Sequence, residues 1–281
     1  MHRFGFVAII CVVPLVACVP RGAPAPSDGG SDAAPDVVPF EFFGGFIIQE
    51  FSAPIPTDSY AIDSAVAVFV ARRTIVEPQP APLIHSAGSC EMREGAGTDG
   101  MFDVQSLDPG PITVRGANDF PVITFSPFGG GYLGDLPPDL GNVWADGDEL
   151  TFEVVGGPSF GSALFTMLAP AQAGFLEPAV SNGAIGGILR SDDLVFVWPV
   201  PLSGDGEISI MLWSSVDLAT VTCAFSDSGS ATIPAKALQW LPPGDIYVHF
   251  SRTRRSEGVN ADGYFVRAEL SSMAVVPATL E

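Results

Sequence analysis

The sequence is poor in positive charge. It contains 12 Lys and Arg against 32 Asp and Glu, which gives a formal net charge of −20 at pH 7, and its only lysine is Lys236. Proteins that bind nucleic acid need clustered positive side chains, which displace counterions from the phosphates. This balance argues against nucleic acid as a partner and predicts an acidic, self-repelling surface.

Metal and cofactor chemistry also has few side chains to draw on. The chain has 3 histidines and 4 cysteines, and no Cys-x-x-Cys or His-x-x-x-His spacing occurs. Because such spacings are typical of zinc sites, we expect no metal and no cofactor. Aspartates beside glycine, as in residues 146–149, could supply oxygen ligands for calcium, but no segment completes an EF-hand loop and Asp-Gly pairs are common in turns.

Helical periodicity is nearly absent, and alternation of apolar and polar residues takes its place. Apolar residues occupy every second position in the segments 150–154, 208–212 and 221–225, as in strands with one buried face. One short helix is expected at 234–240, where Pro234 precedes it. Frequent turn residues separate the candidate strands, so the sequence predicts an all-β fold. Further candidate strands are 65–71, 101–107, 112–115, 122–126, 163–168, 194–200, 246–251 and 264–270.

A weak internal repeat divides the chain in two. The pattern Leu-x-Pro-Gly-x-Ile-x-Val follows Cys90 at 107–114 and follows Cys223 at 241–248, and a Val-Phe-Val segment precedes each cysteine. The repeat predicts two tandem β-sandwich modules, immunoglobulin-like or jelly-roll-like, with a boundary near Gly157. Coincidence among Pro-Gly turns in a chain rich in both residues is the alternative.

The N-terminal segment has the features of an export signal. Arg3 precedes a nearly unbroken apolar run from Phe4 to Ala17, which is short for a permanent membrane-spanning helix. After Cys18 the composition changes to Pro, Gly, Ser and Asp up to residue 39. That composition predicts an extended, flexible tether.

Leu15-Val16-Ala17-Cys18 resembles the lipobox of bacterial lipoproteins. The resemblance implies cleavage between Ala17 and Cys18 and a diacylglyceryl group on the Cys18 thiol, whose acyl chains would hold the chain on a membrane. In that family, Val19 in place of an aspartate after the cysteine implies the outer membrane of a Gram-negative bacterium. An ordinary signal peptide and an uncleaved anchor are the alternatives. The expected parts are a signal peptide, a lipidated tether with 41–51 as a candidate first strand, and two modules, at 1–17, 18–56, 57–157 and 158–281.

Cys90 and Cys223 are the cysteines outside the N-terminal segment. Export would place them in an oxidising compartment, where a disulfide could close a long loop. The repeat points the other way, because it puts the two cysteines at equivalent positions in separate modules. We therefore expect two free thiols, with a disulfide as the alternative.

The segment 157–161 fits the G-x-S-x-G pattern of a nucleophile elbow, with Ser159 as the nucleophile and His249 as a base later in the chain. Pro158 restricts the backbone before the serine, and His249 lies in a strand-like run. A turn between two strands explains the segment better, so we expect no enzyme. An envelope serine hydrolase that uses Ser159 and His249 is an alternative function.

Two further features suggest binding. Arg252, Arg254 and Arg255 lie between two candidate strands, and they predict a loop that could dock an anionic glycan, a lipid head group or an acidic partner. A solvated hairpin tip is the alternative. A carbohydrate-binding module would instead need an exposed aromatic platform. The candidates for such a platform are Tyr132, Trp144 and Trp213.

Together these features predict a lipid-anchored protein of the cell envelope with a non-catalytic binding or structural role. Its expected partners are the membrane, through the lipid on Cys18, and a protein or glycan of the envelope. The alternative functions are the serine hydrolase and the carbohydrate-binding module.

Overall fold

The computed structural model describes residues 41–51, 64–76, 81–93, 101–116, 122–128, 131–136, 143–201, 206–214 and 219–281. The predicted signal peptide, Cys18 and the segment up to residue 40 lie outside these residues. The all-β prediction is confirmed, because the described residues form strands β1 to β18 and one four-residue helix, α1. No helix among them is both long enough and apolar enough to cross a membrane.

The elements alternate with short turns along the whole chain. The first nine strands are β1 (Glu41–Phe51), β2 (Ser64–Val76), β3 (Leu83–Ala87), β4 (Cys90–Arg93), β5 (Met101–Ser106), β6 (Ile112–Gly116), β7 (Ile123–Phe128), β8 (Gly131–Gly134) and β9 (Glu149–Val154). The remaining elements are β10 (Ala163–Leu168), β11 (Val180–Ser181), β12 (Ala184–Ile188), β13 (Leu194–Val197), β14 (Glu207–Ser214), β15 (Thr220–Ser226), β16 (Ser230–Ile233), α1 (Ala235–Leu238), β17 (Gly244–Val259) and β18 (Phe265–Leu280).

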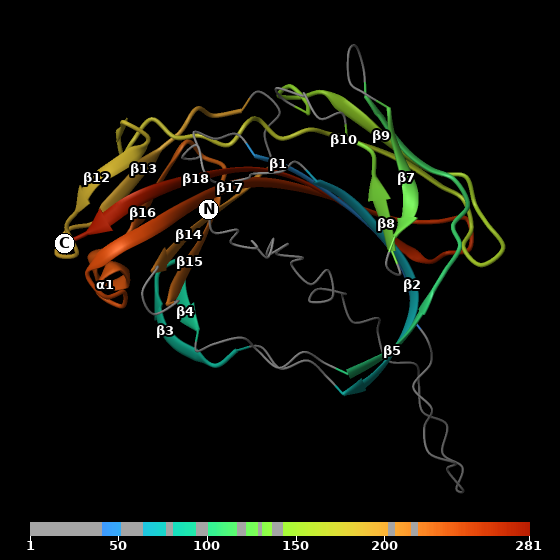
Figure 1. Cartoon of the computed structure of the whole chain (residues 1–281), viewed down its shortest axis with the longest axis horizontal. Helices are drawn as coiled ribbons and strands as arrows, with labels where there is room; N and C mark the ends of the chain where they lie inside the picture. The colour runs from blue at the N-terminus through green and yellow to red at the C-terminus, as the bar shows by residue number, and fades with distance from the viewer. Residues whose placement is uncertain are drawn as a thin grey trace, which may run out of the picture. The chain divides into compact units, whose positions relative to one another are not determined.

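Most strands belong to one mixed sheet, whose order is β10-β9-β6-β7-β8-β2-β1-β18-β17-β14-β15-β4-β3. β5 pairs with β2 and β12 with β18 beside this path, and β13 and β16 form a separate two-stranded sheet. β1 lies in the middle of the large sheet, antiparallel to β2 and parallel to β18 (Figure 1). The candidate first strand at 41–51 is therefore confirmed, as a central strand.

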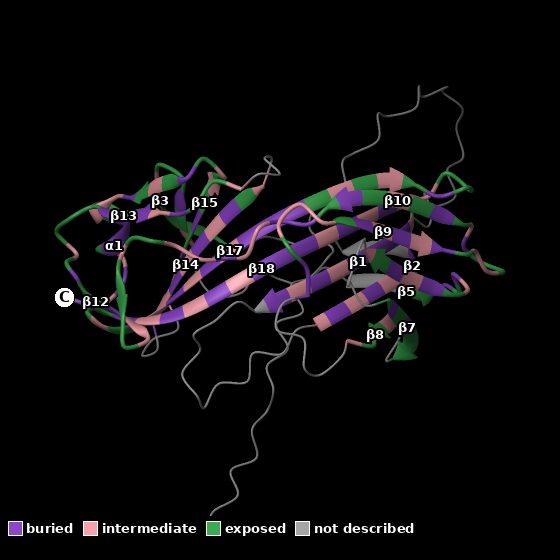
Figure 2. Cartoon of the chain, turned by 90° about the horizontal axis from the view of Figure 1, so that it is seen from above, coloured by how far each residue is buried: buried purple, intermediate pink, exposed green. Residues whose placement is uncertain are grey.

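The hairpin of β17 and β18 lies in the middle of the large sheet, between β1 and β14. Its two strands pair without interruption from Gly244 opposite Leu280 to Val259 opposite Phe265. Buried and more accessible positions alternate along much of both strands (Figure 2), as expected when the two faces of a sheet meet different surroundings. Three consecutive buried residues in each strand, 252–254 and 270–272, interrupt the alternation where these segments pair. The two strands are long enough to run past both hydrophobic clusters of the molecule.

The first hydrophobic cluster is rich in phenylalanine. The Phe46 ring lies 5.2 Å from Phe152 and 5.6 Å from Phe69, both edge to face, a favourable arrangement for aromatic pairs. β18 supplies its buried residues Val266, Ala268 and Leu270 to this cluster. Strands from both halves of the sequence thus build it.

The second hydrophobic cluster packs β14, β15 and β17 against β13, β16 and α1. Phe250 lies 5.4 Å from Trp198, and Phe196 is fully buried nearby. β18 contributes again, through Ala274, Val276 and Ala278. The large sheet is continuous and carries both clusters, so the fold is not clearly the two tandem sandwiches that the repeat suggested. The predicted boundary near Gly157 falls between β9 and β10, which pair with each other.

A buried polar network joins the two clusters. Gln172 donates from Nε2 to Glu50 Oε2 at 3.0 Å and to the carbonyl of Trp144 at 2.9 Å. Its amide oxygen accepts a hydrogen bond from Ser272 Oγ at 3.2 Å, and Ser272 Oγ accepts one from the amide of Ala173. Buried polar groups are stable only when they are paired in this way.

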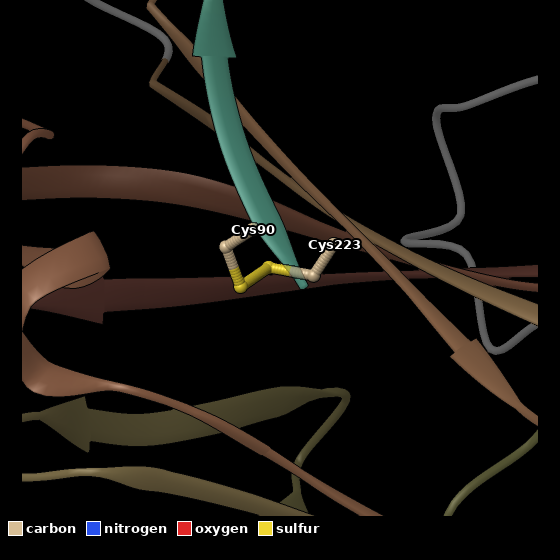
Figure 3. The surroundings of a disulfide bond; sticks show 2 residues. All are labelled: Cys90 and Cys223. Atoms are coloured by element: carbon tan, nitrogen blue, oxygen red, sulfur yellow. A yellow bond between two sulfur atoms is a disulfide. The ribbon is translucent and has the colours of Figure 1, made fainter. Parts of the chain in front are cut away.

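Cys90 and Cys223 form a disulfide, so the expectation of free thiols is wrong (Figure 3). The two residues face each other across the ladder between β4 and β15, with their Cα atoms 4.0 Å apart. The repeat gave the wrong answer because β4, which comes from the first half of the sequence, pairs with β15 beside the second cluster. The two cysteines consequently share one buried environment, where neither side chain is exposed.

Candidate functional site

A depression of about 460 Å³ lies at the end of β14 and β15. Four serines, one carboxylate and one aromatic ring dominate its wall, and we call it the serine pocket. It is lined by Ser89, Gly206, Glu207, Ala224, Phe225, Ser226, Ser228 and Ser230. Serine hydroxyls both donate and accept hydrogen bonds, so the wall offers both functions to a ligand.

The pocket exists because β15 is longer than its neighbour. β15 pairs with β4 only at Val221, Thr222 and Cys223, and one further bond runs from the amide of Ala224 to the carbonyl of Ser89 at 3.1 Å. There the β3–β4 hairpin turns back, while β15 continues to Ser226. The step between the long strand and the short hairpin leaves the depression.

Arg252 supports the rim of the pocket from inside the protein. Its side chain is 2% exposed, and its Nε lies 2.8 Å from Asp227 Oδ2. Its Nη2 donates to Asp227 Oδ1 at 3.2 Å and to the carbonyl of Pro199 at 2.9 Å, and its Nη1 donates to the carbonyl of Gln172 at 3.1 Å. Asp227 lies in the turn between β15 and β16, and its amide donates to the carbonyl of Gly206 on the rim.

The side-chain nitrogen of a core tryptophan completes this buried site. Trp198 Nε1 donates to Asp227 Oδ1 at 2.7 Å, and the Asp227 side chain is only 1% exposed. A buried carboxylate is tolerated when a counter-charge and hydrogen bonds replace its water. The turn that carries Ser226, Ser228 and Ser230 is thereby fixed to the second cluster.

Arg255 holds the carboxylate on the pocket wall. Its Nη1 lies 2.6 Å from Glu207 Oε2, and its Nε lies 2.8 Å from Glu269 Oε2. Burial disfavours the charged guanidinium, but hydrogen bonds and the negative charges of Glu269 and Glu207 outweigh it and raise the pKa of Arg255. The negative charge of Glu207 is thus paired at the pocket.

The predicted loop of Arg252, Arg254 and Arg255 is wrong, because all three residues lie within strand β17. As whole residues, Arg252 and Arg254 are 1% and 9% exposed, and Arg254 Nη1 donates to the carbonyl of Leu168. The hairpin turn comes later, where Asn260 Oδ1 accepts hydrogen bonds from the amides of Asp262 and Tyr264. Charge clustering suggested an exposed loop, but carboxylates and carbonyls from distant segments pair with these arginines, and only Arg255 is exposed.

Of the three predicted platform aromatics, Trp144 is buried, whereas Tyr132 and Trp213 are half-buried. Trp144 is 3% exposed and donates from Nε1 to the carbonyl of Pro170, and Tyr132 packs against the first cluster. Trp213 stacks on Tyr247 with ring centroids 5.5 Å apart and an interplanar angle of 26°. Tyr247 was not among the predicted aromatics, although it alternates with the buried Ile246 and Val248 in β17, which places it on the face opposite to theirs.

The Trp213–Tyr247 pair belongs to a continuous strip on β14. Ile208, Ile210 and Leu212 are fully buried, so the alternate residues face the other side of the sheet. We call these alternate residues, with their cross-strand partners, the outer strip. In order along β14 they are Glu207 opposite Thr253 and Ser226, Ser209 opposite Ser251 and Ala224, Met211 opposite His249 and Thr222, and Trp213 opposite Tyr247 and Thr220. The strip therefore leads from the aromatic pair to the wall of the serine pocket.

Ser159 and His249 have separate surroundings. Ser159 Oγ accepts a hydrogen bond from the amide of Asp108 at 2.7 Å and donates to the Asp108 carbonyl at 3.4 Å. His249 lies in β17 between Met211 and Val275 in the ladders, and desolvation by burial lowers its pKa. No hydrogen bond joins the two side chains in the described part of the chain. In this structure Ser159 therefore links the segment after β9 to the turn at Asp108 between β5 and β6.

The described residues contain no group of three or more His, Cys, Asp or Glu side chains that could hold a metal ion. A second depression, of about 360 Å³, has apolar walls from Ile185, Ile188, Leu189 and Leu194 together with Asp192 and Asp193.

No protein-family model matches the chain, and no curated protein matches it significantly in sequence.

Proposed function

We propose that the chain is a lipid-anchored protein of the cell envelope that acts by binding, without catalysis. The observation that carries the proposal is the N-terminal pattern, in which Arg3 and an apolar run lead to Leu15-Val16-Ala17-Cys18 and a tether-like composition follows. The Cys90–Cys223 disulfide supports it, because structural disulfides persist mainly in oxidising compartments outside the cytoplasm. Val19 after the lipidated cysteine favours the outer membrane.

A binding role fits the arrangement of side chains better than hydrolysis does. The Ser159 hydroxyl is hydrogen-bonded to the backbone of Asp108. A serine nucleophile would instead need a base within hydrogen-bond reach. The serine pocket and the outer strip instead gather hydroxyls, amphipathic aromatics and paired charges on one region of the sheet. Such a mixture of apolar area and a few polar groups is typical of ligand sites.

Replacing the lipid-bearing residue tests the proposal. The Cys18→Ala variant should accumulate as an uncleaved, unlipidated precursor, because the thiol is the attachment point of the lipid. Metabolic labelling with a radioactive fatty acid and phase partitioning in detergent would measure both effects. Cys11→Ala, in the same apolar run, is the matched control and should be labelled normally. A Cys18→Ala protein that is still labelled and still enters the detergent phase would disprove the anchor.

A further inference from the structure

We propose that the serine pocket and the outer strip form one binding site for an uncharged oligosaccharide, with one sugar ring in the pocket and another against the Trp213–Tyr247 pair. The proposal rests on the binding role proposed above and names the ligand class. It combines the two ends of β14, because Glu207 lines the pocket at one end and Trp213 stacks on Tyr247 at the other.

The pocket suits a sugar ring in size and chemistry. Its volume of about 460 Å³ is within the range of small-molecule sites, roughly 300–1,000 Å³. Ser89, Ser226, Ser228 and Ser230 line it together with Glu207, so residues with hydroxyl donors and acceptors border the open depression. Sugar hydroxyls also donate and accept, and unlike an apolar ligand they would leave few of these wall groups without a partner.

The charges around the site favour an uncharged ligand. Glu207 is paired with Arg255 and Asp227 with Arg252, so neither sign is in excess at the pocket. At the neighbouring strand, Arg93 Nη2 lies 2.7 Å from Glu91 Oε2. The chain as a whole carries a formal charge of −20, which repels anionic polymers.

The aromatic pair supplies the second contact. Trp213 and Tyr247 are half-buried and stacked, and aromatic side chains combine a large apolar surface with a polar end. The apolar C–H face of a sugar ring can pack on such a surface while its hydroxyls reach the polar neighbours. Thr220 lies opposite Trp213 in the ladder, and His249 lies one row further along.

The distance between the two ends calls for a chain of sugars. Trp213 and Glu207 are six positions apart on β14, which at about 3.3 Å per residue is roughly 20 Å. One monosaccharide cannot reach both ends, whereas an oligosaccharide of several rings can lie along Ser209 and Met211. Binding at both ends of one ligand should raise the affinity above that of either end alone.

Titration of the purified, folded chain with soluble hexasaccharides tests the proposal. The probes are cellohexaose, maltohexaose and chitohexaose, and the readouts are calorimetry and tryptophan fluorescence. At least one probe should bind in the millimolar range or tighter, and the matching monosaccharide should bind more weakly. Trp213→Ala and, separately, Ser226→Trp, which fills the pocket, should each weaken binding about tenfold or more.

Two matched controls separate the site from general effects. Phe128→Ala removes an aromatic ring that is 70% exposed on β7, and Leu189→Trp fills the second depression; both should bind like the unaltered chain. Trp213→Tyr keeps a ring on the strip and should keep most of the affinity, which covers the case in which Trp213→Ala fails to fold.

The proposal is overturned if no hexasaccharide binds at millimolar concentration, or if the Trp213 and Ser226 variants bind normally. Tighter binding of a sulfated or uronic-acid oligosaccharide, or of an extended peptide beside the end of β15 that continues past β4, would also overturn it. The outcome is independent of the anchor, because the titration needs no lipid. Loss of the sugar site would leave the Cys18→Ala result standing, and normal labelling of Cys18→Ala would leave the titration standing.

Discussion

Replacing Arg252 with methionine should lower the free energy of unfolding by about 3–5 kcal/mol. The methionine side chain fills similar space but offers no donor, so Asp227, whose side chain is 1% exposed, would keep a buried charge without its counter-charge. The carbonyls of Gln172 and Pro199 would also lose their donors. The bond from Trp198 Nε1 to Asp227 remains, which places the expected loss toward the lower end of that range.

Two companion variants make the measurement decisive. Arg255→Met removes an arginine three positions along the same strand, but that side chain is 40% exposed, so its loss should cost less than about 1 kcal/mol. Adding Asp227→Asn to Arg252→Met removes the buried charge and keeps an acceptor for Trp198, so it should restore most of the lost stability. Urea unfolding at pH 7, followed by tryptophan fluorescence, gives all three values. A loss of stability in Arg252→Met no larger than that in Arg255→Met, or a double variant less stable than Arg252→Met alone, would refute the role of the buried charge pair.

Three further predictions concern residues away from the pocket. Changing both Cys90 and Cys223 to alanine should cost about 4–5 kcal/mol in urea unfolding, since the bridge joins residues 133 positions apart; a loss below about 1 kcal/mol would contradict this. Ser159→Ala should cost about 1 kcal/mol, from its bonds to Asp108, and loss of a measured esterase activity in this variant would argue for the hydrolase. The folded-state pKa of His249 is lowered, so the unfolded chain binds protons first and stability should fall as pH drops below about 6.5. His249→Gln should flatten that part of the pH profile, and an unchanged profile would contradict the effect of burial.

Alternation in the sequence was enough to predict the fold class and many strands. Leu150, Phe152 and Val154 are almost completely buried, as their spacing implied, because a strand with one face against a core must place apolar residues at every second position. The pairing of strands could not be predicted in the same way. Nothing local in 41–51 indicates that it lies parallel to the strand at 265–280, since that choice depends on the packing of the whole sheet.

The site itself was only partly foreseen. Trp213 was identified from its alternation, whereas the serine pocket draws Ser89 from one hairpin and Ser226 from another, and no spacing along the chain connects them. The cluster of Arg252, Arg254 and Arg255 stands out in the sequence, but it was predicted to lie in an exposed loop, whereas all three residues lie in strand β17. Arg252 is buried because Asp227, twenty-five positions earlier, enters the same buried site, and a partner at that distance leaves no pattern in the sequence.

The central place of β1 has a consequence for how the protein is made. Its nine residues Phe43 to Phe51 bond along one side to β18, which is the last strand, so the middle of the sheet stays open until almost the entire polypeptide is present. Pairings between residues so far apart form slowly. If the chain is exported through its N-terminal signal, as proposed above, β1 crosses the membrane long before β18, and the centre of the sheet can close only after nearly the whole chain has crossed.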